Sequence, residues 1–246
     1  MEFRDPLSSL THSLAAVWAV FATAFLLRLC PPLLLRRLSL WVFGGSMVFL
    51  FMASGLYHAV PYTKEANPAE HRFFQTLDQS AIFILIAGSN APFMIVLLRG
   101  RWQRLCLAAM WGLAFAGVAC LWLVEKPPHA VMIVIYWLMG VLGLVPFRRY
   151  SRTIGWRPML WAGLGGVFYS VGAFCELIGW PTPRYYPLRF GHHEVFHLFV
   201  IAASASFYAL VLRHIVRYQS PATDTKAHEK PWISLPNTRA RESFRG

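Results

Sequence analysis

Five ionisable side chains lie within long apolar segments of this sequence, and their types suit metal chemistry. They are His58, Asp78, Glu176, His193 and His197. A charge at the centre of a bilayer costs about 2.5–3.5 kcal/mol on insertion scales, so ionisable residues kept in membrane-spanning segments tend to be functional. His193 and His197 are four residues apart, as are Ser54 and His58, so each pair lies on one helical face.

Two imidazoles one helical turn apart can reach a single metal ion, and His58 would complete a set of three. Three histidines are the ligands of catalytic zinc sites that keep one coordination position open. Magnesium and calcium prefer oxygen ligands, so neutral imidazoles favour Zn2+. We therefore expect zinc at His58, His193 and His197. Asp78 is the candidate general base, and Ser54 is a candidate hydrogen-bond donor to the water or the oxyanion.

Other polar residues have simpler interpretations. The histidines at the ends of apolar segments are interpreted as interfacial residues: His12, His71, His129 and His214. His192 directly precedes His193 and must point elsewhere on the helix. Glu176 is interpreted as an interfacial or helix-pairing carboxylate, and Ser54 has the alternative of hydrogen-bonding a helix carbonyl.

One motif indicates a different function. Residues 193–197 are His-Glu-Val-Phe-His, which matches H-E-x-x-H, the zinc-protease pattern in which the glutamate is the general base. The motif lies in the last apolar segment, and His228 in the polar tail after it is far from the membrane. The third ligand would have to be His58, from upstream, so an intramembrane zinc peptidase is a minor alternative.

The apolar segments are long enough to cross a membrane. Apolar residues make up 57% of the 246 and charged residues 14%, whereas a soluble domain carries about a quarter charged residues. A helix of about 20 residues spans the hydrocarbon core, and seven segments qualify: 12–30, 39–60, 76–98, 102–124, 129–147, 157–180 and 191–213. We expect an all-α, seven-helix transmembrane domain over 1–213 and a disordered, basic, polar tail over 214–246. The four cysteines fall in or beside apolar runs and are expected to be packed thiols.

The distribution of charge predicts topology. The net charge of +12 does not indicate a nucleic-acid partner, because the basic residues lie in short connections and in the tail. With seven spans, the N-terminus and the second, fourth and sixth connections share one side and carry six of the 23 Lys and Arg residues. The positive-inside rule then places the N-terminus outside and the C-terminus in the cytoplasm, in the plasma (inner) membrane. The same topology brings His58, Asp78, Glu176, His193 and His197 to one membrane face at similar depth.

Three motifs in order resemble the hemolysin III family. They are residues 54–58 (Ser-Gly-Leu-Tyr-His), residues 77–82 (Leu-Asp-Gln-Ser-Ala-Ile) leading to residues 86–93 (Ile-Ala-Gly-Ser-Asn-Ala-Pro-Phe), and residues 191–200 (Gly-His-His-Glu-Val-Phe-His-Leu-Phe-Val). The resemblance covers spans two to seven. This family is the bacterial branch of the progestin-and-adipoQ receptors, which are themselves similar to the alkaline ceramidases.

The resemblance implies a seven-helix bundle with zinc on His58, His193 and His197. The aspartate of the family corresponds to Asp78 and its serine to Ser54, and the ceramidase relatives cleave a lipid amide. The adipoQ receptors place their N-terminus in the cytoplasm, opposite to the charge count. We keep the charge count because it comes from this chain.

The leading hypothesis is therefore a zinc-dependent hydrolase of a lipid amide, with a membrane lipid or another fatty-acid-containing molecule as substrate. The alternative is a membrane receptor or sensor whose zinc is structural. A pore-forming hemolysin is disfavoured, because the spans lack a run of polar residues along one face to line a channel.

Overall fold

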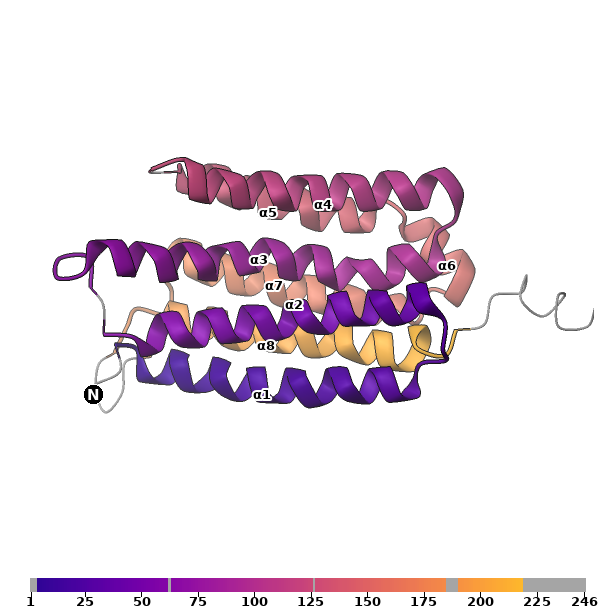
Figure 1. Ribbon diagram of the computed structural model, residues 1–246, viewed down its shortest axis with the longest axis horizontal. Helices are drawn as coiled ribbons and strands as arrows, with labels where there is room; N and C mark the ends of the chain where they lie inside the picture. The colour runs from indigo at the N-terminus through magenta and orange to yellow at the C-terminus, as the bar shows by residue number, and fades with distance from the viewer. Residues whose placement is uncertain (1–3, 62, 126, 185–189, 219–246) are drawn as a thin grey trace, which may run out of the picture.

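The chain folds into a bundle of roughly parallel and antiparallel helices, in a computed structural model that describes residues 4–61, 63–125, 127–184 and 190–218 (Figure 1). Within these residues the secondary structure is helical apart from one isolated bridge between Arg184 and Phe190. The helices are α1 (Pro6–Leu29), α2 (Leu34–Ala59), α3 (Pro68–Leu97), α4 (Gly100–Leu123), α5 (His129–Leu144), α6 (Phe147–Ile154), α7 (Met159–Ile178) and α8 (His192–Leu210), which continues into a π-helical turn, η1 (Val211–Ile215).

Six of the described helices are long and apolar enough to span a membrane, and a bent pair of helices makes seven if the pair is counted as one span. The pair is α5 and α6, which meet at an angle of 40° after Leu144. The all-α membrane bundle expected from the sequence is therefore confirmed. The outer surface is rich in exposed large apolar side chains such as Phe21, Phe25 and Trp137, as expected for a surface in contact with lipid.

The helix ends differ from the hydropathy boundaries. Residues 68–75, expected to form a connection, are the first turns of α3, which starts with Pro68 in the first turn. The basic segment after α5 forms the short helix α6, which ends at Gly155 with a positive φ of 85°. Hydropathy marks where the hydrocarbon core starts, whereas caps and backbone torsions mark where the helix starts. At the other end of the chain the helix reaches Ile215, and residues 219–246 of the expected tail lie outside the described residues.

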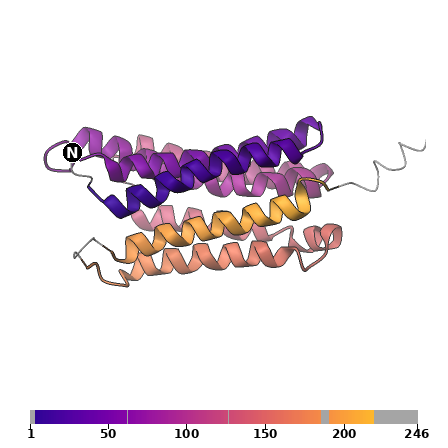
Figure 2. The ribbon, with the colours of Figure 1, turned by 90° about the horizontal axis from the view of Figure 1, so that it is seen from below.

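Most sequential helices pack against each other, and α8 packs against both α7 and α1, so the last long helix lies beside the first (Figure 2). Small residues allow these close approaches. A Cβ atom on Gly44 of α2 would overlap the Thr23 side chain of α1, and one on Gly117 of α4 would overlap the Phe83 ring of α3. The cysteines of the described chain are free, and Cys30, Cys106 and Cys175 are buried, as expected for packed thiols.

The helix directions place the functional candidates at one end of the bundle. The C-terminal end of α2, the N-terminal ends of α1, α3 and α8, and the C-terminal end of α7 lie together at the end marked N (Figure 1). The connections that precede α3 and α8 lie at this same end, as the alternation of spans predicts.

Candidate metal centre

Three histidines from two helices converge at this end of the bundle. His58 lies in the last turn of α2, and His193 and His197 lie in the first two turns of α8. Their potential ligand atoms all lie within 4.8 Å of one another. His58 and His197 are each 2% exposed, whereas the His193 side chain is 30% exposed. The cluster is therefore buried on the α2 side and open on the His193 side.

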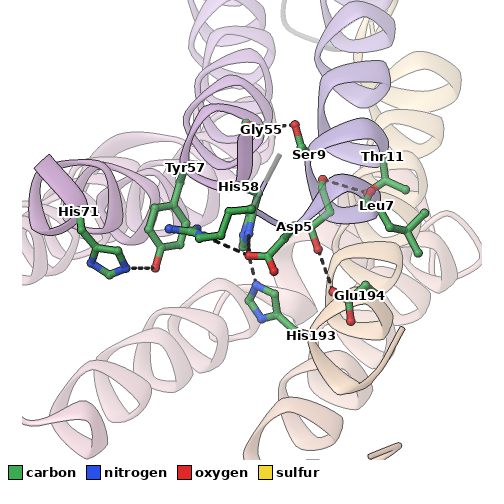
Figure 3. Close-up of polar contacts among 12 residues, drawn as sticks. Asp5, Leu7, Ser9, Thr11, Gly55, Tyr57, His58, His71, His193 and Glu194 are labelled. Atoms are coloured by element: carbon green, nitrogen blue, oxygen red, sulfur yellow. Dashed lines mark hydrogen bonds and ion pairs between the residues drawn. The ribbon is translucent and has the colours of Figure 1, made fainter. Parts of the chain in front are cut away.

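The orientation of two of these rings fits a shared cation. The Nε2 atoms of His58 and His193 face each other at 3.2 Å (Figure 3). The buried Nδ1 atom of His197 makes no hydrogen bond within the described part of the chain. Buried polar atoms in native proteins nearly always have a partner. Three imidazoles with facing or unpartnered nitrogens are the donor set of a zinc site, so the residues present fit this ion.

Each of the two facing rings is held from behind by a carboxylate. His58 Nδ1 lies 3.0 Å from Asp5 Oδ2, and His193 Nδ1 lies 3.2 Å from Glu176 Oε1. The second carboxylate oxygen of Glu176 lies 2.8 Å from Nδ1 of His192. Glu176 therefore links α7 to α8, in agreement with its interpretation as a helix-pairing residue, and His192 is not part of the three-histidine cluster.

Asp5 precedes α1 and is the N-cap residue of that helix. Burial raises the pKa of this carboxyl, but hydrogen bonds and charge interactions with His58 and Arg4 outweigh burial and hold the pKa below its usual value. Asp5 is therefore an anion at neutral pH, and its charge lies next to the ring of His58.

Asp78 and Ser54 lie together beside the histidines. Ser54 is 2% exposed and stands one turn before His58 on α2. The partly buried carboxylate of Asp78, on α3, interacts with the Ser54 side chain and with His193. The structure thus brings together all five residues singled out for the site: His58, His193, His197, Asp78 and Ser54.

Glu194 of the H-E-x-x-H motif has a structural role. Its Oε2 atom accepts a hydrogen bond of 2.8 Å from the backbone N–H of Gly191 and so caps α8. Its Oε1 atom accepts a hydrogen bond of 3.2 Å from Ser8 of α1, and the residue is 4% exposed. With both oxygens engaged away from the histidine cluster, Glu194 is not placed as a general base. This geometry disfavours the peptidase alternative.

Two residues of the first helix region were not identified from the sequence. Asp5 lies outside the apolar segments, and the interpretation of His12 as an interfacial residue is wrong. His12 is 2% exposed, and its ring stacks on that of His197 with centroids 3.9 Å apart. The hydroxyl of Ser9 donates a hydrogen bond of 3.1 Å to the carbonyl of Gly55, next to the cluster.

A recognisable signal for this contact was present. Polar residues recur at positions 5, 8, 9 and 12, which share one face of a helix, in a segment whose other residues are largely apolar. Such a polar face in a membrane helix indicates contact with polar groups in the bundle interior.

Comparison with known proteins gives one consistent result. The family model described as Haemolysin-III related matches residues 2–208. The chain is 26% identical over 212 residues to the Hemolysin-3 homolog of Bacillus subtilis (strain 168), which covers 85% of this chain and 93% of that protein. It is 30% identical over 175 residues to Hemolysin-3 of Bacillus cereus, covering 71% and 74% of the two chains. It is also 25% identical over 218 residues to the human Monocyte to macrophage differentiation factor, covering 89% and 86%.

Proposed function

This chain belongs to the haemolysin-III-related family and is a multi-pass membrane protein, and we propose that it is a zinc-dependent hydrolase of a lipid amide. The observation that carries the proposal is the convergence of His58, His193 and His197 beside Asp78 at one end of the helix bundle. Three histidines and a carboxylate on rigid helices match the composition of a hydrolytic zinc site.

The three histidines would hold the ion, and three protein ligands leave the fourth position of a tetrahedral zinc site for water or substrate. When bound, zinc would polarise the substrate carbonyl and make a water molecule more acidic. The rigidity of the site comes from the helices, because α2 and α8 are fixed on each other through α1. Ser9 bonds to α2, and Ser8 bonds to α8.

Asp78 would act as the general base. Its carboxylate would take a proton from the attacking water at one of its oxygens and later deliver it to the leaving amine. Ser54 would orient that carboxylate or donate its hydroxyl proton to the oxygen of the tetrahedral intermediate. Both side chains lie on helices adjacent to the histidines, so no large movement is needed to bring them into play.

The depth of the site supports a lipid as substrate. His58 is the penultimate residue of α2, and His193 is the second residue of α8. At a rise of about 1.5 Å per residue, both lie within a few ångströms of the helix ends, near the boundary between headgroups and acyl chains. The linking amide of a lipid lies at that same boundary. A lipid entering sideways would reach the ring of His193, the most exposed ligand.

We place the site on the outer face of the plasma membrane, with the C-terminus in the cytoplasm, because of the bias of Lys and Arg residues. A reporter that fluoresces in the cytoplasm and one that is active outside, each fused after Tyr218, test this orientation. Activity of the outer reporter alone would reverse the placement.

Metal analysis and a lipid screen test the function. Purified protein should contain close to one equivalent of zinc, and the double variant His193→Ala, His197→Ala should contain less than about a tenth of it. The zinc-loaded protein should release fatty acid from at least one member of a panel of lipid amides, as measured by mass spectrometry. Full zinc occupancy with no turnover on the panel would instead favour a receptor or sensor with structural zinc.

A further inference from the structure

We propose that Asp5 and Glu176 are positioning residues of the metal site, which fix the rings of His58 and His193 so that both present Nε2 to the ion. The inference rests on the zinc binding proposed above, but it concerns the affinity of the site and is independent of any hydrolytic activity. It assigns a role to a residue before the first helix and to a residue of α7, neither of which contributes a ligand.

The contacts of Asp5 determine how His58 lies. Besides the side-chain contact of 3.0 Å, the backbone N–H of Asp5 donates a hydrogen bond of 3.1 Å to the carbonyl oxygen of His58. Asp5 thus binds His58 through both its backbone and its side chain, and Figure 3 shows the carboxylate beside the ring. Arg4 adds a hydrogen bond of 3.2 Å to the same carboxylate and lies over the ring of Tyr57 at 4.0 Å.

Asp5 stands at the N-cap position of α1, but its side chain contacts His58 and does not cap the helix. An aspartate at an N-cap normally accepts a hydrogen bond from the first turn of its own helix, which is worth about 1 kcal/mol. The side chain of Asp5 makes no such capping bond with α1. Its carboxylate is directed to His58 instead, which indicates that this contact is the more favourable one.

The chemistry of imidazole explains what the two carboxylates achieve. A neutral histidine carries one N–H and one lone pair on its two ring nitrogens. A carboxylate accepts the N–H and therefore selects the tautomer protonated at Nδ1, which leaves the lone pair on Nε2. Asp5 and Glu176 both bind Nδ1, so the two rings have the same tautomer. Their Nε2 atoms are the pair that face each other at 3.2 Å.

The charge of the two carboxylates is a second reason to expect that they strengthen zinc binding. A divalent cation bound by three neutral histidines carries two positive charges into the largely buried end of the bundle, and burial of uncompensated charge is costly. Two carboxylates, each separated from the ion by one imidazole ring, balance that charge. Outer carboxylates of this kind also make the histidine a stronger ligand.

The third ligand is supported differently. Nδ1 of His197 makes no hydrogen bond within the described residues, and the ring is stacked on His12. Asp5 and Glu176 therefore act on two of the three ligands, so removal of each should weaken the site without abolishing it.

The affinity for zinc, measured by competition with a chromophoric chelator on the purified full-length protein, tests the proposal. Asp5→Asn and Glu176→Gln keep the size of each side chain but remove its charge, and each should weaken zinc binding about 10- to 100-fold. In cobalt-substituted protein, the visible absorption band should shift in both variants, because the ligand field changes with ring orientation. Glu70→Gln, an exposed carboxylate in the first turn of α3 at the same end of the bundle, is the matched control and should change neither.

A folding defect is separated from a loss of positioning by helix content and by gel filtration in the absence of metal. Glu176→Asp and Asp5→Glu keep the negative charge, so they should bind zinc more tightly than Glu176→Gln and Asp5→Asn. Folded Asp5→Asn and Glu176→Gln proteins with zinc affinity within twofold of the wild type would overturn the proposal, as would a wild-type protein that binds no zinc. Zinc binding without turnover would contradict the hydrolase function and leave this proposal standing.

Discussion

The imidazole rings of His12 and His197 lie face to face, with centroids 3.9 Å apart and planes inclined by 18°. One ring belongs to α1 and the other to α8, so this stack joins the beginning of the helical domain to its end. The lone pair of an imidazole nitrogen lies in the ring plane, and zinc binds it at about 2.0–2.1 Å. Two stacked rings cannot both direct a lone pair at one ion, so we expect His12 to support the proposed ligand His197 and not to be a fourth ligand itself.

Replacement of His12 by phenylalanine should therefore leave zinc binding intact. Phenylalanine preserves a flat ring against His197 and removes two buried nitrogens that make no hydrogen bond within the described residues. His12→Ala removes the ring and should destabilise the protein by about 2–4 kcal/mol through the cavity that it leaves. Zinc stoichiometry and thermal unfolding are the measurements. Loss of zinc from a folded His12→Phe protein would show that His12 is a ligand after all.

Most of the candidate metal centre can be predicted from the sequence, for a physical reason. Histidines four apart on a helix share a face, and alternation of spans fixes which helix ends meet, so His58, His193 and His197 can be brought together without coordinates. Ser54 and Asp78 follow from the same two rules. The structure places all five at one end of the bundle, although the roles assigned to them remain predictions.

The contribution of α1 was harder to predict. Spacing within a helix indicates which residues share a face, but not which neighbouring helix that face contacts. The contact between α1 and α8 joins residues more than 180 positions apart, so the polar face of α1 shows that it contacts polar groups but not that α8 supplies them. The same limit applies to Glu194, because a motif match alone does not show that its carboxylate caps its own helix.

Asp78 should be needed for turnover but not for metal. We expect Asp78→Asn to retain zinc and to lose about 10²- to 10⁴-fold in the rate of lipid amide hydrolysis, the usual contribution of a general base. Ser54→Ala should also retain zinc, with a smaller loss of rate. Fatty-acid release and zinc content, measured on the same preparations, separate the two effects. Undiminished turnover by Asp78→Asn would remove this residue from the catalytic machinery.

Glu194 should be needed for stability but not for turnover. Glu194→Ala removes a helix cap and the bond from Ser8, and it should destabilise the protein by about 1–3 kcal/mol. Hydrolysis of the lipid amide by the folded fraction at low temperature should stay within a few-fold of the wild type, because the carboxylate takes no part in the reaction. A loss of turnover as large as that of Asp78→Asn, at normal stability, would revive the peptidase-like role of the motif.

Substitutions of two adjacent glycines of α2 should separate an effect on helix packing from an effect on the metal site. A Cβ atom on Gly44 would overlap the side chain of Thr23, whereas one on Gly45 would meet nothing within 4 Å. Thr23 cannot turn away easily, because its hydroxyl donates a hydrogen bond of 2.6 Å to the carbonyl of Ala19. Gly44→Ala should therefore force α1 and α2 apart and destabilise the protein by about 1–3 kcal/mol, while Gly45→Ala should be close to neutral.

Zinc affinity should be the same in these two variants. Gly44 and His58 are separated by 14 residues along α2, about 21 Å at a rise of 1.5 Å per residue, so the strain should relax before it reaches the histidines. Thermal unfolding in detergent and chelator competition measure the two quantities independently. Equal melting temperatures would show that α1 and α2 can separate at this point without cost. Weakened zinc binding in Gly44→Ala alone would show instead that the register of α1 along its whole length controls the metal centre.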